Sequence, residues 1–203
     1  MIIPEYTAED LKRLPLRAIV ALAARCARRV EHLALPPDGH PDSDAYRQAV
    51  SDALRMAEDF ARGHPCPSSE SVIRAVEKCR DAAQENRARQ NALAAAVQAA
   101  YSAASATNAL DIRSEPAERH PLGPRPEPGP LDHLKDVTAD LAALCAFTAA
   151  VDAADAVGYT DTFIKGAVAD YRAIESLHLG NYPEAGRPID PSAAGPLGSF
   201  VVE

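Results

Sequence analysis

The stretch that decides the fold class reads LRAIVALAARCARRVEHLA, from Leu16 to Ala34. Its apolar residues recur at steps of three and four, which places them along one face of an α-helix. Pro15 stands just before it, where the fixed φ of proline suits the first turn of a helix. We therefore predict a helix from Pro15 to about Ala34. Its buried face is expected to comprise Leu16, Ile19, Val20, Ala23, Cys26, Ala27, Val30 and Leu33.

Most of the remaining chain shows the same helical periodicity. It predicts helices over about 43–62, over 131–157 and from about 160 to 179. Residues 69–113 contain neither Gly nor Pro, so they form either one long helix or two helices joined near residues 86–91. No stretch alternates polar and apolar residues in the way that a strand requires. In the helix over 131–157, the side chains expected to point inward are Leu134, Leu141, Leu144, Cys145, Thr148 and Val151.

These elements predict an all-α protein, built as an antiparallel bundle of five or six helices. Residues 1–180 are expected to form this single domain, interrupted by a Pro-rich loop over 111–130. Residues 181–203 have no periodicity and are interpreted as an irregular C-terminal tail. Because the closing residues LGSFVVE include several large apolar side chains, we expect this tail to dock on the bundle.

Charge and composition argue against several classes of protein. The 203-residue chain has a formal net charge of −8, which does not favour general binding to nucleic acid. It has no charge-free run of about eighteen apolar residues, so we expect neither a transmembrane helix nor a membrane partner. The opening MIIPEYTAED lacks the basic and apolar regions of a signal peptide, and the four cysteines form no CxxC pair. We therefore expect a cytoplasmic protein with reduced thiols.

Basic residues are concentrated in and just before the first long predicted helix. Between Leu11 and Val30 the chain has six basic residues and no acidic one. One hypothesis makes Arg17, Arg25, Arg28 and Arg29 a binding stripe for another protein with an acidic surface, or for RNA. The RNA hypothesis is weaker because no aromatic residues interleave for base stacking. The internal alternative, to which we give more weight, pairs the stripe with the acids of the helix over 131–157, which are Asp132, Asp136, Asp140, Asp152 and Asp155.

Glu175 and His178 form an ExxH motif near the end of the last predicted helix. Residues three apart share a helical face, and carboxylate-bridged metal centres in helical bundles use this pair. Such centres need two of these motifs and further carboxylates, which aspartates of the helix over 131–157 would have to supply. A metal- or small-ligand-binding bundle is therefore the alternative function. His64 and Cys66 supply two ligands in one loop, fewer than the four of a structural zinc site.

Motifs of enzymatic chemistry are missing from the sequence. It contains no GxxxxGK[ST], no GxGxxG and no GxSxG, so neither a phosphate-binding loop nor a nucleophile elbow is predicted. We therefore expect a non-enzymatic protein without a cofactor. The main hypothesis is a helical adaptor or regulatory module that binds another protein, and the sequence leaves its oligomeric state open.

Two segments carry a family resemblance. The first is LPLRAIVALAARCARRV, from Leu14 to Val30, and the second extends from Ile189-Asp-Pro-Ser to Gly195-Pro-Leu-Gly198. They resemble the opening and the end of uncharacterised helical proteins of planctomycete-type bacteria. The resemblance covers a minor part of the chain. It implies that the C-terminal tail belongs to the native protein, and it brings no known activity.

Overall fold

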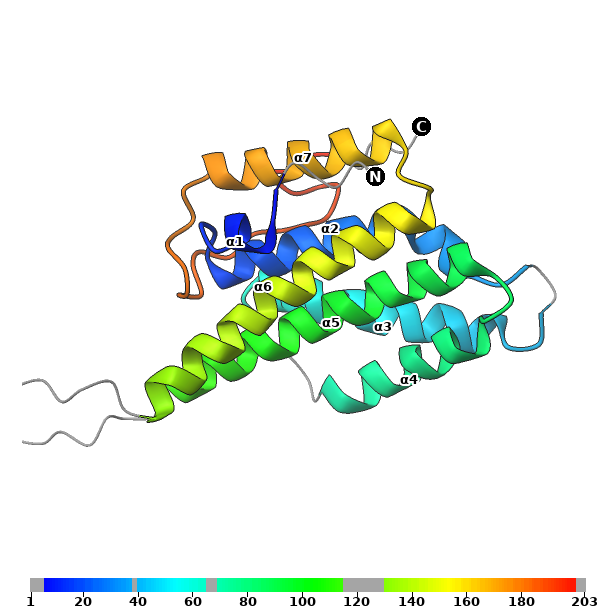
Figure 1. The fold of residues 1–203 in the computed structure, drawn as a ribbon, viewed down its shortest axis with the longest axis horizontal. Coiled ribbons are helices and arrows are strands. Elements are labelled where there is room, and N and C mark those ends of the chain that lie inside the picture. The colour runs from blue at the N-terminus through cyan, green and yellow to red at the C-terminus, as the bar shows by residue number, and fades with distance from the viewer. Residues whose placement is uncertain (1–5, 38–39, 65–68, 115–129, 200–203) are drawn as a thin grey trace, which may run out of the picture.

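The computed structural model describes residues 6–37, 40–64, 69–114 and 130–199. These ranges contain seven α-helices and no strand, which confirms the predicted all-α class. Figure 1 shows the helices as a bundle, with α7 and the C-terminal segment on one side of α2. The helices are α1 (Ala8–Leu11), α2 (Leu16–Ala34), α3 (Ser43–Ala61), α4 (Ser69–Ala82), α5 (Arg87–Ser114), α6 (Pro130–Ala156) and α7 (Asp161–Ser176).

The segment without Gly or Pro is two helices rather than one. A turn over 83–86 separates α4 from α5, and Asn86 caps the second helix. Its side-chain oxygen accepts a hydrogen bond from the backbone N–H of Arg89 at 2.9 Å. Asparagine favours this position because its side chain satisfies an N–H group that has no partner inside the helix. The structure thus settles the alternative that the sequence left open.

Two helices extend into the segment predicted as the Pro-rich loop. α5 continues to Ser114, and α6 begins at Pro130. The predicted loop over 111–130 is therefore too long, because its first residues still belong to a helix. Residues 115–129 lie outside the described residues, as does Cys66.

The centre of the bundle is built from alanine. α5 and α6 run antiparallel, since Ser102 donates to the carbonyl of Ala142 at 2.8 Å while Asn91 donates to Asp155 at 2.8 Å. Alanine side chains let helix backbones approach closely, which brings the Ser102 hydroxyl within reach of a carbonyl on the next helix. The fully or almost fully buried residues of α6 are Ala139, Ala142, Ala143, Ala146, Ala149, Ala150, Ala153 and Ala154.

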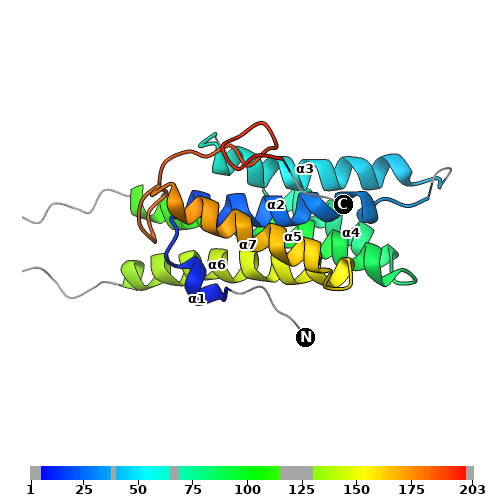
Figure 2. The same ribbon diagram turned by 90° about the horizontal axis from the view of Figure 1, so that it is seen from above.

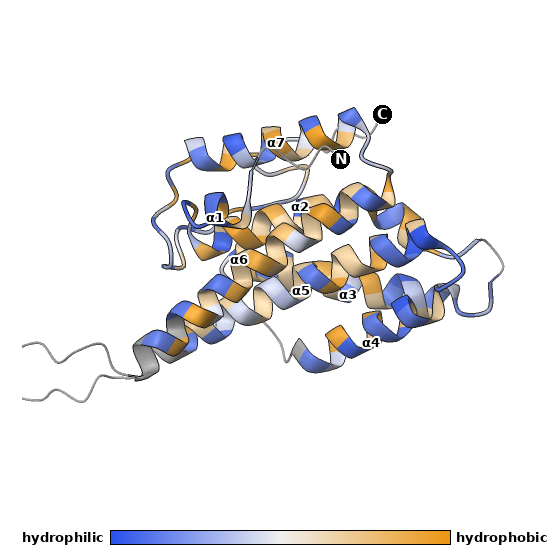
Figure 3. Cartoon of the chain, viewed as in Figure 1, coloured by the Kyte–Doolittle hydropathy of each residue, from blue (hydrophilic) through white to orange (hydrophobic). Residues whose placement is uncertain are grey.

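The predicted inward face of α6 is therefore largely wrong. Leu134, Leu141 and Leu144 are 46–51% exposed, although Cys145 of the predicted set is buried. The large side chains were taken for the core because leucine usually marks it. In α6 alanines face the bundle, and these three leucines face outward. Figure 3 shows this helix, which lies at the front of the molecule, with strongly hydrophobic residues along its exposed length.

Backbone groups of the C-terminal segment form hydrogen bonds with the ends of two helices. α2 begins after Pro15 without a side-chain cap, and its first N–H groups donate to the carbonyls of Glu184 and Ala185 at 2.8 and 3.0 Å. The N–H of Ile189 donates to the carbonyl of Ala61, the last residue of α3, at 2.9 Å. Figure 2 shows this segment crossing from the end of α7 over α2 and α3. Phe200, Val201 and Val202 lie outside the described residues.

Candidate functional site

Arg25 and Arg29, two members of the proposed binding stripe, lie inside the protein. Their exposed fractions are 1% and 4%. Both guanidinium groups contact one carboxylate oxygen of Asp170 on α7, at 2.7 Å from Arg25 Nε and 2.6 Å from Arg29 Nη1. Arg25 also donates to the carbonyls of Pro191 and Gly198 in the C-terminal segment. The pair joins α2 to α7 and to the tail.

The groups packed around this cluster are neutral. Burial raises the pKa of the Cys26 thiol to about 11, and it also raises the pKa of the Tyr6 hydroxyl well above its ordinary value. The Tyr6 ring stacks on that of Tyr171, with centroids 5.0 Å apart. A neutral thiol is a poor nucleophile, so Cys26 behaves here as a small apolar core residue.

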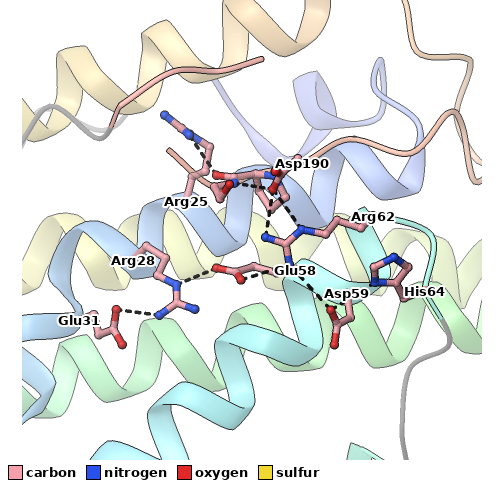
Figure 4. A network of polar contacts seen from close by, with 10 residues as sticks. Arg25, Arg28, Glu31, Glu58, Asp59, Arg62, His64 and Asp190 are labelled. Atoms are coloured by element: carbon pink, nitrogen blue, oxygen red, sulfur yellow. Dashed lines mark hydrogen bonds and ion pairs between the residues drawn. The ribbon is translucent and has the colours of Figure 1, made fainter. Parts of the chain in front are cut away.

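Arg28 belongs to a second network, which is partly exposed and shown in Figure 4. Its Nε donates to Glu58 of α3 at 2.7 Å, and its Nη1 donates to Glu31 at 2.8 Å. Glu58 also contacts Arg62, which in turn pairs with Asp190 of the C-terminal segment at 3.0 Å. The network ties α2, α3 and the tail together.

The remaining basic residues also have partners inside the chain. Arg17 donates to the carbonyl of Gly186 at 2.8 Å. Lys12 pairs with Asp140 of α6 at 3.1 Å, in agreement with the predicted pairing to the acidic helix. The arginines of the stripe pair instead with α3, α7 and the tail. Burial of Arg25 and Arg29 leaves little of the stripe on the surface.

The ExxH pair does not share a helical face, so its predicted geometry is wrong. α7 ends at Ser176, and His178 follows it with a φ of 46° in the left-handed region. Glu175 and His178 line an open pocket of about 350 Å³ with residues such as Arg13 and Asn181. Among the described residues, no three His, Cys, Asp or Glu side chains are grouped so that they could hold a metal ion.

A larger hollow of about 550 Å³ lies beside the turn between α4 and α5. Its lining is mostly polar and includes His40, Tyr46, Asp81 and Arg89. The backbone N–H of Asp42 donates to His40 Nδ1 at 3.2 Å, and the Tyr46 hydroxyl donates to the carbonyl of Cys79. Both ring groups thus have structural roles, and no nucleophile with a paired base stands among the lining residues.

The most unusual surface is the outward face of α6. We define the α6 seam as an outward row of six residues in which successive residues are three or four apart. The members of the seam are Leu134, Val137, Leu141, Leu144, Thr148 and Val151. The first four members are exposed, and the last two are partly buried. This spacing is the heptad pattern by which two helices pack side by side.

The same helix meets the length and composition of a membrane span over residues 136–156, and about half of that window is buried inside the protein. A core helix passes this test as readily as a membrane helix does. The expectation of no transmembrane helix therefore stays a prediction. α6 combines a buried alanine face with an outer apolar seam, and a helix that is apolar on both faces is ordinarily covered on both.

Acidic side chains border the seam on both sides. Toward α1, Asp140 accepts hydrogen bonds from Lys12 and the Tyr182 hydroxyl. Toward α4 and α5, Tyr101 is 36% exposed and donates to Glu77 at 3.0 Å. Farther along that side, burial and the nearby Asp155 raise the pKa of Asp152 to about 6.

Comparison with protein-family models, with curated proteins and with solved structures finds no match for this chain.

Proposed function

We propose that this protein is a non-enzymatic helical interaction module that binds another protein through the α6 seam. The observation that carries this proposal is the exposure of four large apolar residues in one row of a helix whose opposite, alanine-rich face is buried. Contiguous apolar surface of this kind marks interaction sites on folded proteins. An adaptor also needs no reactive group, which agrees with the structural roles of the titratable residues described above.

The α6 seam is a different surface from the arginine stripe of α2. Arg25 and Arg29 could contact a partner only after α7 and the tail had separated from α2, because Asp170 and the tail carbonyls surround them. The α6 seam is accessible without any such rearrangement. A docked helix would also bury apolar area, which is the main favourable term in most protein association.

The test compares two double variants of the full chain in lysate of the source cell. Leu141→Ser with Leu144→Ser alters the seam, while Asp44→Ser with Arg47→Ser alters an exposed pair on α3. We expect native mass spectrometry to show a second, identifiable polypeptide on the wild type and on the α3 variant. The seam variant should lose it, and the purified pair should reassemble. Equal retention by both variants contradicts the assignment of the seam.

A further inference from the structure

We infer that the partner segment is an amphipathic helix whose apolar face is flanked by lysine or arginine. This inference rests on the proposed function, since it names the chemistry of the partner at the α6 seam. The spacing of the seam indicates the shape of the partner, and the charges beside the seam indicate the sign of the partner's charge.

The spacing points to a helix. From Leu134 to Val151 the seam follows steps of 3, 4, 3, 4 and 3 residues, the repeat of a left-handed pair of helices. At a rise of 1.5 Å per residue this seam is about 26 Å long, which matches a partner helix of about eighteen residues. The partner's apolar side chains would insert between neighbours such as Val137 and Leu141 on this row, as knobs enter holes in coiled coils.

The charges beside the seam select a basic partner. Acids stand both on the α1 side of the seam and on the side of α4. They are Glu9, Asp136 and Asp140 on the first side, and Glu77 and Asp152 on the second. Lys12 pairs with Glu9 and Asp140, and Arg80 lies near Asp152, so the described acids outnumber the described bases beside them. Lysine or arginine flanking the partner's apolar row would complement this border.

The same charges disfavour two other occupants. In a second copy of this chain, the acids of one border would face the like-charged acids of the other, which suppresses pairing. An anionic membrane surface would be repelled for the same reason. Residues 115–129 of the chain itself contain Leu122 as their one large apolar residue, so they cannot supply a matching row.

The test uses the full chain and three synthetic peptides of about 21 residues, three heptads each. The first has leucine in the a and d positions and lysine in e and g, and the second has glutamate in place of lysine. The third has the composition of the first with its leucines dispersed, so it measures charge attraction alone. We expect fluorescence anisotropy at about 150 mM salt to show one lysine peptide bound per chain, at least about tenfold tighter than either other peptide.

Three variants of the protein locate the binding. Leu141→Ser with Leu144→Ser should weaken binding of the lysine peptide by about tenfold or more. The helicity of the protein should be unchanged, because both side chains are exposed. Asp136→Lys should weaken binding by about threefold, the size of an exposed ion-pair effect. Asp44→Lys, which makes the same charge change on α3 at a side chain that is 99% exposed, should leave it unchanged.

Each contrary result has a distinct meaning. Equal binding of the lysine and glutamate peptides would overturn the basic partner and leave the interaction module standing. A wild-type dimer in sedimentation equilibrium, together with a monomeric seam variant, would also overturn the basic partner. The seam would then bind a second copy of this chain. Binding to phosphatidylglycerol vesicles without binding to any peptide, or no binding at all, would overturn both this inference and the proposed function.

Discussion

Asp170 pairs with two buried guanidinium groups through a single carboxylate. Breaking a buried ion pair by removing one partner leaves a charge without compensation, which costs about 3–5 kcal/mol. We therefore expect Asp170→Asn, which keeps the size of the side chain, to lower the free energy of unfolding by about that amount. Urea denaturation measures it, with the exposed Asp44→Asn as the control. A loss below about 1 kcal/mol would contradict the assigned role of the carboxylate.

Asp152 should make stability depend on pH in the opposite sense from an ordinary paired carboxylate. Burial and Asp155 raise its pKa in the folded protein from 3.8 to about 6, so the folded state binds a proton more readily than the unfolded chain. Stability from this group is therefore greatest below about pH 4 and is lost as the pH rises through about 6.

Replacing Asp152 by Asn removes this ionisation. We expect the variant to be more stable than the wild type at about pH 7.5, by about 1–2 kcal/mol, and the difference to shrink at about pH 4.5. Urea denaturation of both proteins at the two pH values checks it. The same difference at both values would show that the carboxylate titrates normally.

At the scale of the helices, periodicity predicted which segments are helical, but it did not always predict which face of a helix is buried. In α3 the large apolar residues Tyr46, Val50 and Phe60 are all buried, so this helix follows the rule that large apolar side chains mark the core. In α6 the same rule failed, since Leu141 and Leu144 face outward while alanines make the close contact. Periodicity locates an apolar row, but a helix with two apolar rows leaves open which one is buried.

The two rows of α6 should respond oppositely to a change in side-chain size. Ala149→Leu inserts a large side chain into the closely packed interior and should cost about 1–3 kcal/mol or more. Leu144→Ala on the seam should change stability by less than about 0.5 kcal/mol, because that side chain is half exposed. Thermal and urea unfolding of both variants measure the contrast. A larger loss for Leu144→Ala would mean that the seam is covered within the protein.

Across the protein as a whole, the C-terminal segment holds together helices that are far apart in the sequence. The sequence indicated that a tail would dock, but it could not show that backbone groups near residue 185 cap α2. Such caps are non-local and leave no residue pattern at the helix start. The ExxH pair failed for a related reason, because the turn at His178 that begins this segment ends α7 before the motif is complete.

Truncation after Tyr182 tests this role of the tail. It removes the carbonyls that cap α2, the N–H of Ile189 that caps α3, and the carbonyls that Arg25 contacts. Each lost hydrogen bond costs about 1 kcal/mol, and the bonds to the buried guanidinium cost more, so we expect a loss of at least about 3 kcal/mol. Hydrogen exchange should quicken at Leu16 and in α7 while the centre of α5 stays protected. Equal melting of the truncated and full-length chains would show that the tail adds no stability.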